Sequence, residues 1–487
     1  MGIFDITHAL ASFLPEVSAP KIPPTGKERL MWTGVALVLF FLMYNTMCFG
    51  VQQPESAGLD FLQTITASNI GSLLTAGIGP IVFASIFLQL FNGAGLINLN
   101  MRDKNDKKKF LETQKILAIC LAFITAIVYV VTFRVTIIPL FEGLGEGYIM
   151  NPDGTTSLYA PFTMAMVILQ IALGSIIILY LDEILTKYGI GSGISLFIAA
   201  GVSFAIMTGL IQLIVGYSGI LQLMTEGGAE ALPNALLVLS PFLATVVVFL
   251  IVVYFEGVKV EIPIAFERVR GLVPKLPLKY FYVSNIPVIF ASALIMNIYL
   301  FSGMLAGADL DVGGINVVDI IASVDPNGHL NDGLLYLMTP PRFSMITDWE
   351  YFINATTPVW GIPEWFHAIF YVITLAILSL LFGLFWVETS NMDAKSVAAQ
   401  LQSSGLQIPG FRRDPRMLES ILNKYIFPLT VLGALSVGIL AGMADLTGAL
   451  GSGTGILLTV GILYRMYEQM EQQQMFDVFP ALKFLTK

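Results

Sequence analysis

Apolar runs of bilayer length dominate this sequence and leave few folds open to it. A helix needs about 20 apolar residues to span the hydrocarbon core. Eight such runs occur among the 487 residues, and a ninth is shorter and rich in glycine. They are Leu30–Val51, Ile116–Ile138, Phe162–Leu181, Ile194–Val215, Leu236–Phe255, Ile286–Leu305, Phe366–Val387, Tyr425–Met443 and the short Gly448–Tyr464.

Composition points to the same environment. The chain is 56% hydrophobic and 12% charged, with a mean hydropathy of +0.78, whereas soluble domains carry about twice that share of charge. A membrane β-barrel is excluded because its strands alternate apolar and polar residues over about ten positions. With one interrupted run, the sequence predicts an all-α membrane protein of ten transmembrane helices.

The interrupted run reads "LDFLQTITASNIGSLLTAGIGPIVFASIFLQLF" over residues 59–91. Polar side chains break its first half, and Gly71, Gly77 and Pro80 follow. Non-helical backbone at membrane depth is tolerated only where protein or a water-filled cavity surrounds it. We therefore predict that Leu59–Ser68 is a short helix that re-enters from outside into a wet cavity and obstructs it. The chain should then turn at residues 69–71 and cross once as a full helix.

The basic residues predict the orientation. If the N-terminus is cytoplasmic and ten helices alternate, all of the 25 Lys and Arg except Arg134 and Arg342 fall on the cytoplasmic side. Cytoplasmic loops of membrane proteins carry such an excess. We expect a multi-pass protein of the cell (plasma) membrane with both termini in the cytoplasm. Residues 1–29 form a cytoplasmic leader, within which Ile3–Leu14 could be a surface helix or an unstructured end.

Two predicted cytoplasmic loops, residues 257–283 and 388–424, are long and carry Arg pairs at Gly/Pro turns. The basic residues could serve only to set the orientation. Arginine also binds phosphate in a bidentate manner, and a large polyanion such as ribosomal RNA is a suitable target.

Motifs for catalysis are lacking. The three His are far apart and form no HExxH pattern, and the two Cys stand alone in apolar runs, so neither a metal site nor a disulfide is indicated. The glycine-rich "YGIGSGIS" at 188–195 follows a membrane helix rather than a strand, so it is not a nucleotide loop. We expect no enzyme activity and no cofactor.

Ionisable residues lie at the ends of the predicted helices, as Asp182, Glu183, Glu256 and Glu388 do. Asp445 lies near the turn between the ninth and tenth helices. An ion-coupled carrier places such groups near the midplane. A secondary transporter of a small solute is therefore the less favoured alternative.

Several segments resemble the SecY family, the channel-forming (alpha) subunits of the general secretory protein translocase, in its archaeal form. The resemblance runs from about Leu14 to the C-terminus. The segments are "QTITASNIGSLLTAGIGPIV", "LDEILTKYGIGSGISLFIAAGVS", "VEIPIAFERVRG", "YVSNIPVIFASAL", "FWVETS" and "GTGILLTVGILYRMYEQM".

This resemblance implies two pseudo-symmetric halves. Residues 30–216 would hold helices 1–5 and residues 236–468 helices 6–10, with a hinge loop at 217–235 and a cytoplasmic tail at 469–487. An external plug would match residues 59–68, with Leu59, Phe61, Leu62, Thr64, Ile65, Thr66 and Ser68 as its residues.

The resemblance also implies an hourglass pore narrowed by a ring of aliphatic side chains. Matching the motifs puts the ring on Ile78, Val82, Ile194, Ile198, Ile289 and Leu458. An apolar ring offers ions no ligands and can dewet, while a sufficiently apolar segment of the passing chain could leave sideways into lipid. Gln89 and Asn297 are the loosely matched residues of this lateral gate, although each could equally form an ordinary interhelical hydrogen bond.

Partners follow from the same resemblance. We expect SecE-like (gamma) and beta subunits, and secretory and membrane-protein nascent chains with signal sequences as the transported molecules. The ribosome should dock on the two cytoplasmic loops, with Arg268, Arg270, Arg412 and Arg413 as contacts.

Overall fold

The structure is a computed structural model, and residue placement is described for most of the chain. The described residues are 14–52, 63, 66–93, 95–97, 103–131, 136–141, 146–150, 156–216, 219–226, 231–263, 265–266, 275–305, 311–312, 315–316, 320–324, 330–341, 343–358, 360–403, 406–407 and 415–478.

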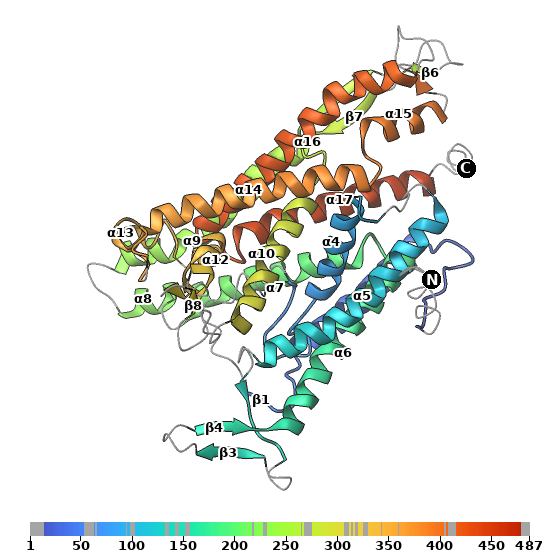
Figure 1. Ribbon diagram of the computed structural model, residues 1–487. Coiled ribbons are helices and arrows are strands. Elements are labelled where there is room, and N and C mark those ends of the chain that lie inside the picture. The colour runs from blue at the N-terminus through green and yellow to red at the C-terminus, as the bar shows by residue number, and fades with distance from the viewer. Residues whose placement is uncertain are drawn as a thin grey trace.

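Ten helices of at least 15 residues make up most of the described chain (Figure 1). Six of them, α5, α6, α7, α9, α14 and α16, are long and apolar enough to cross a membrane, and α4 and α10 are shorter apolar helices. The predicted all-α membrane fold is confirmed. The bounds are α2 Gly26–Asn45, α4 Gly79–Gly93, α5 Lys104–Val131, α6 Pro161–Tyr188, α7 Gly193–Val215, α9 Ala231–Gly257, α10 Ile286–Leu305, α14 Glu364–Thr389, α16 Pro415–Leu446 and α17 Gly453–Val478.

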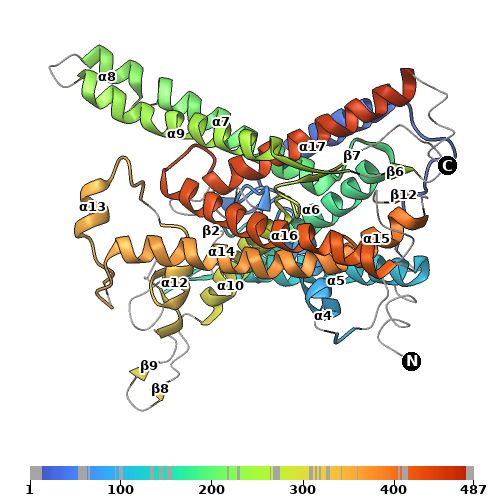
Figure 2. The same cartoon turned by 90° about the horizontal axis from the view of Figure 1, so that it is seen from above.

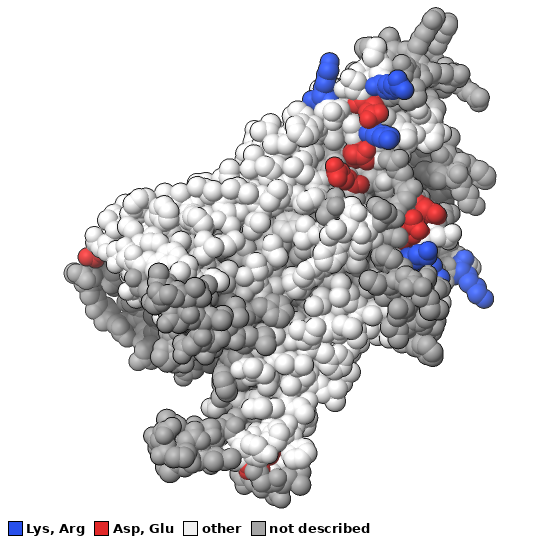
Figure 3. Space-filling model, in the orientation of Figure 1, with Lys and Arg blue, Asp and Glu red and all other residues white. Residues whose placement is uncertain are grey.

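Charged side chains divide the molecule into two ends. On the face shown in Figure 3, Lys and Arg gather at one end, which we call the basic end. The N-terminal segment lies there too: Lys115 donates to the carbonyl of Pro15 at 2.9 Å, and Tyr188 donates to that of Ser18 at 2.9 Å. The opposite end, which holds α12 and α13, is called the far end (Figure 1).

Short elements cover both ends. At the basic end, β5 (Lys259–Pro263) pairs with β7 (Lys275–Lys279), and α15 (Ala394–Ser403) packs on α16. Strand β6 (Ala265–Phe266) pairs with β12 (Leu406–Gln407), so the two predicted cytoplasmic loops meet. At the far end lie the hairpin of β3 (Gly147–Met150) and β4 (Thr156–Tyr159) and the helices α8 (Ile220–Glu226), α12 (Leu334–Met338) and α13 (Trp349–Asn354). Four further short strands are β1 (Val51–Gln52) with β2 (Thr136–Ile137), and β10 (Ser323–Val324) with β11 (Leu330–Asp332); β8 (Asp311–Val312) pairs with β9 (Ile315–Asn316).

Helix α2 shows how local chemistry sets a boundary. It begins at Gly26, four residues before the apolar run, because Thr25 and Glu28 form a capping box. The Glu28 amide donates to the Thr25 hydroxyl, and the Thr25 amide donates to the Glu28 carboxylate at 2.8 Å. The helix ends at Asn45, and Val51–Gln52 then pairs with β2 instead of extending the helix.

The segment after Asn69 corrects one prediction. It is not helical from residue 72 onward: turns run to Ile78, and α4 begins only at Gly79. The hydroxyls of Ser72 and Thr75 accept hydrogen bonds from the nearby backbone amides of Leu74 and Gly71 at 3.1 and 3.0 Å, which competes with helix formation.

One large apolar core joins the helices that precede residues 217–235 and those that follow them. It includes residues of α2, α4, α5, α6, α7, α9, α10, α14, α16 and α17. Helices α14 and α16 lie side by side in both Figure 1 and Figure 2. Helix α17 contacts α7, α9 and α16.

Candidate functional site

The six predicted ring residues all belong to this core or pack against it. They belong to the turn before α4 and to helices α4, α7, α10 and α17. Ile78, Ile198 and Leu458 are fully buried, Val82 and Ile289 are nearly so, and Ile194 is partly buried against the same cluster. The turn before α4 and the helices α4, α7, α10 and α17 therefore contribute aliphatic side chains to one apolar core.

The end of the predicted plug lies directly beside the ring. The carbonyl of Thr66 accepts a hydrogen bond from the amide of Ile78 at 2.9 Å. Ala67, with a positive φ of 48°, is fully buried within the same core cluster as Ile78 and Ile198. Thr66 and Ser68 are buried too, and their hydroxyls share a hydrogen bond of 2.6 Å. The expectation of a wet surrounding is therefore wrong for Thr66 and Ser68.

The other named plug residues, Leu59, Phe61, Leu62, Thr64 and Ile65, lie outside the described residues. Gln63 is described: its carbonyl accepts from the Ser68 amide at 2.9 Å.

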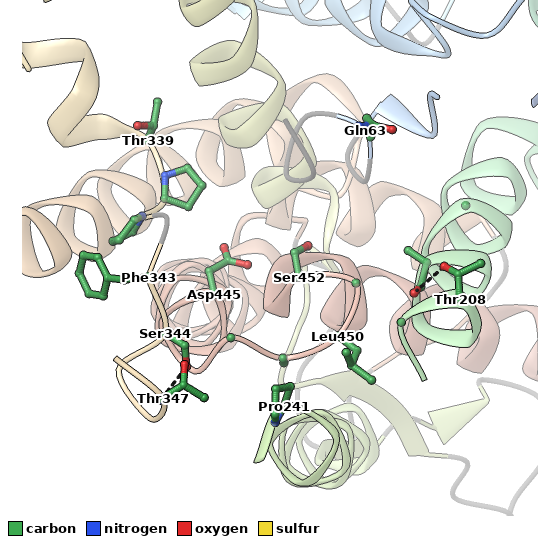
Figure 4. A pocket seen from close by; sticks show the side chains of 18 of the residues that line it. Gln63, Thr208, Pro241, Thr339, Phe343, Ser344, Thr347, Asp445, Leu450 and Ser452 are labelled. Atoms are coloured by element: carbon green, nitrogen blue, oxygen red, sulfur yellow. Dashed lines mark hydrogen bonds between the residues drawn. The ribbon is translucent and has the colours of Figure 1, made fainter. Parts of the chain in front are cut away.

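A cavity of about 970 Å³ opens next to the plug end, toward the far end of the molecule (Figure 4). Gln63 lines it from one side, Thr208 and Gln212 of α7 from another, and Asp445 of α16 and Ser452, just before α17, from a third. The far-end segment Tyr336–Asp348 supplies further lining residues: Tyr336, Thr339, Pro340, Pro341, Phe343, Ser344, Thr347 and Asp348. Both polar and apolar groups face this space.

Glycines allow backbone segments to meet around the plug end. A Cβ on Gly77, whose φ is +50°, would lie 2.2 Å from the Thr66 carbonyl oxygen. A Cβ on Gly174 of α6 would lie 1.8 Å from the carbonyl oxygen of Leu73. Such approaches are impossible for any residue with a side chain. The floor, which we define as residues 66–79, is therefore fixed against α6 by direct backbone contact.

The two predicted gate helices are neighbours, since α4 contacts α10. Gln89 donates its side-chain amide to Ser85 Oγ at 2.9 Å, and Asn297 donates to the Ala293 carbonyl at 2.7 Å. Each side chain therefore bonds within its own helix, one turn back. The elements of the gate are adjacent, and the polar role of these two residues stays a prediction.

Sequence reasoning missed a polar contact beside the ring. Asn285, fully buried before α10, donates its side-chain amide to the Leu457 carbonyl at 2.9 Å, next to Leu458. A Cβ on Gly461 would lie 1.9 Å from that amide nitrogen and 2.7 Å from Glu256 Oε1. The motifs "SNIP" and "TVGIL" contain Asn285 and Gly461, but nothing in the sequence indicates that these two residues meet.

The predicted docking arginines Arg268, Arg270, Arg412 and Arg413 lie outside the described residues. Their loops are joined by the β6–β12 pair, which stands beside both stretches in the sequence. Among the described residues, no three or more His, Cys, Asp or Glu side chains form a group that could hold a metal ion.

Comparisons with known proteins agree with one another. The SecY family model matches residues 72–467. The protein translocase subunit SecY of Methanocaldococcus jannaschii is 42% identical over 97% of this chain and 98% of its own length, and that of Pyrococcus horikoshii is 39% identical over 100% of both. A solved structure described as a protein-conducting channel has a TM-score of 0.78 at 39% identity and covers 99% of both chains. Sec61 in a canine ribosome–channel complex from the endoplasmic reticulum has a TM-score of 0.75 at 38% identity, again over 99% of both chains.

Proposed function

The chain belongs to the SecY family, and we propose that it is the central subunit of a channel that passes unfolded secretory polypeptides across a membrane. The observation that carries this proposal is that all six aliphatic side chains belong to, or pack against, one apolar core that also holds Ala67 of the plug end, next to a cavity lined by Gln63 and Gly201. A translocation pore needs such a constriction, and it needs water on either side of it for the polar backbone of the passing chain.

The described arrangement corresponds to a closed channel. Ile78, Ile198 and Leu458 are fully buried, and the plug end covers the ring toward the cavity. An apolar constriction offers ions no coordinating groups and excludes water when it is empty. Branched aliphatic side chains can also repack around an extended chain, because no directional bond ties them to one another.

Lateral release into lipid is part of the proposal. Helices α4 and α10 contact each other, while the side chains of Gln89 and Asn297 each donate a hydrogen bond within their own helix. Separation of the two helices would therefore leave both of these hydrogen bonds intact. A segment apolar enough to favour the bilayer would partition through that gap.

We propose that the protein lies in the plasma membrane with its basic end in the cytoplasm. Basic residues favour the cytoplasmic side, and the N-terminal segment packs at that end through Lys115 and Tyr188. The cavity then faces outside. SecE-like and beta subunits would complete the complex, and the ribosome would dock on the joined cytoplasmic loops. The solute-transporter alternative finds no support in the comparisons.

Crosslinking tests the pore. Cys48 and Cys120 are first replaced by Ser and Ala, and a single cysteine is then placed at Ile78, Ile194 or, as a control, at Leu173, which is 46% exposed on the outer face of α6. A ribosome-stalled secretory chain should crosslink to the first two positions and not to the control. Crosslinks at neither ring position would refute the proposed path.

Charge reversal tests the docking loops. Arg412→Glu with Arg413→Glu should weaken ribosome binding, most strongly at low salt, where charges are least screened. The matched control is Lys107→Glu with Lys108→Glu, two exposed residues at the same end on α5. Equal loss in both double variants would mean that only the overall charge matters, and unchanged binding in the first would remove these arginines from the contact.

A further inference from the structure

We propose that Asp182 and Asp445 are paired positioning residues, one in each half, that hold the starts of the two ring-bearing helices α7 and α17. The inference rests on the proposed function, because it takes the ring as the constriction of a pore. Each carboxylate belongs to the helix that precedes the ring-bearing helix, α6 for Asp182 and α16 for Asp445.

In the first half, Asp182 Oδ1 accepts a hydrogen bond from the backbone amide of Ile194 at 2.9 Å. Ile194 is the second residue of α7. The first residue, Gly193, lies so close to α6 that a Cβ there would be 2.6 Å from the Asp182 Cα and 2.8 Å from its Oδ1. The absence of a side chain at Gly193 lets the helix start dock on the carboxylate.

The second half repeats this arrangement. Asp445 Oδ1 accepts from the backbone amide of Thr454 at 2.9 Å, and Thr454 is the second residue of α17. The first residue is again glycine: a Cβ on Gly453 would lie 2.1 Å from the Ala444 carbonyl carbon. Asp445 Oδ2 also accepts from the hydroxyls of Thr454 and of the fully buried Tyr371 on α14.

The ring residues stand in the same register to the two contacts. Ile198 follows the bonded amide of Ile194 by four residues, and Leu458 follows that of Thr454 by four residues. A spacing of four places each ring residue on the same helix face as the bonded amide, one turn onward. Both side chains are fully buried in one cluster. The two carboxylates thus fix equivalent points on the two helices.

The physical effect of each contact is directional. The first amides of a helix have no partner within it, and the helix dipole makes its start favourable for negative charge. A carboxylate that accepts from such an amide sets both the height and the rotation of the helix start. Without it, the helix can shift or turn by part of a residue step, and the ring side chain one turn away moves with it.

Glu183, next to Asp182, supplies a matched control. Its carboxylate pairs with Lys115 and Lys187 at 2.9 Å each, and it accepts from the amide of Val17 at 3.2 Å. These contacts tie α6 to α5 and to the N-terminal segment, and none of them is with α7. Glu183→Gln should lower the thermal stability of the complex without opening the pore.

The experiment is single-channel recording of purified complexes in planar bilayers, together with thermal unfolding. Asp182→Ala and Asp445→Ala should each raise the open probability about tenfold, which corresponds to about 1.4 kcal/mol. Asp182→Asn and Asp445→Asn keep one acceptor oxygen, so their increase should be smaller, about threefold. Tyr371→Phe leaves the amide contact of Thr454 intact and should stay closed.

The outcomes separate this inference from the proposed function. Folded Ala variants with the open probability of the unaltered protein would overturn it, as would a leak in Glu183→Gln of the same size. If an Ala variant does not assemble, the Asn variant decides: an unchanged open probability overturns the inference and an increase supports it. Replacement of Ile78, Val82, Ile194 and Ile198 by Gly is the positive control, since a closed channel there would refute the pore itself.

Discussion

The floor and the ring meet at Ile78, which belongs to both, yet the rest of each region is held together by different forces. In the floor, the contacts are made to backbone: Gly174 lies against the Leu73 carbonyl, and the Ser175 side-chain hydroxyl donates to the Gly77 carbonyl at 3.2 Å. In the ring, aliphatic side chains such as Ile198 and Leu458 meet within an apolar cluster. Backbone contacts permit one arrangement, whereas aliphatic side chains can slide and repack. A gate needs a rigid frame beside a compliant seal, and the two regions differ in that way.

The largest effect should come from a substitution against the floor. Gly174→Ala would place a Cβ 1.8 Å from the Leu73 carbonyl oxygen, and neither backbone can yield easily. We expect a loss of stability of about 3 kcal/mol, the upper part of the range for overpacking. Gly34→Ala on α2 is the control, because a Cβ there has no described heavy atom within 4 Å. Equal melting temperatures of the two variants would contradict the claim that the floor is rigid.

The predicted plug should be more tolerant of removal than the floor. Because residues 66–68 belong to the floor, the informative deletion is Leu59–Ile65, bridged by a short Gly/Ser linker. The complex should fold, flicker open and leak ions, while secretion persists. Adding Gly at Ile78, Val82, Ile194 and Ile198 should make the leak more continuous. Bilayer conductance no higher than that of the unaltered protein in either variant would place the seal elsewhere.

The far end contains a cluster of hydrogen bonds whose contribution to stability should depend on pH. Glu146 is buried; burial alone would raise its pKa, but hydrogen bonds from the Thr163 side chain and from the amides of Thr163 and Phe141 lower the pKa below its usual value. A lowered folded-state pKa means that the carboxylate stabilises the fold above the unfolded pKa of about 4.3. That stability is lost as pH falls through the folded-state pKa.

Glu146→Gln tests this contact, since an amide cannot replace the lost acceptor. The variant should melt at a lower temperature than the unaltered protein at pH 7, and the difference should shrink below about pH 4.3. Thermal unfolding across this range is the measurement. A difference that stays constant down to pH 2 would mean that the ionised carboxylate is not what holds the turn.

The sequence predicted the bundle because membrane crossings follow from apolar length, and it predicted the ring through a family resemblance. It did not predict the floor, because the apolar and glycine residues of 71–78 suit a membrane helix as well as a buried turn. Nor did it reveal the helix-start contacts. Asp182 and Asp445 were recognised as lying near helix ends, but only the folded chain shows which amides they face, at 11 and 8 residues from Gly193 and Gly453.

The smallest effect should come from a conservative change within the ring. Ile198→Val removes one methylene from a fully buried side chain, at a cost of about 1 kcal/mol. Neighbouring aliphatic residues, Leu458 among them, can relax into the space, so the channel should stay closed in bilayer recordings. Ile198→Asn, of similar size but polar, is the matched variant and should leak because it lets water into the ring. If valine leaked as much as asparagine, closure would depend on exact fit, and the ring would be as rigid as the floor.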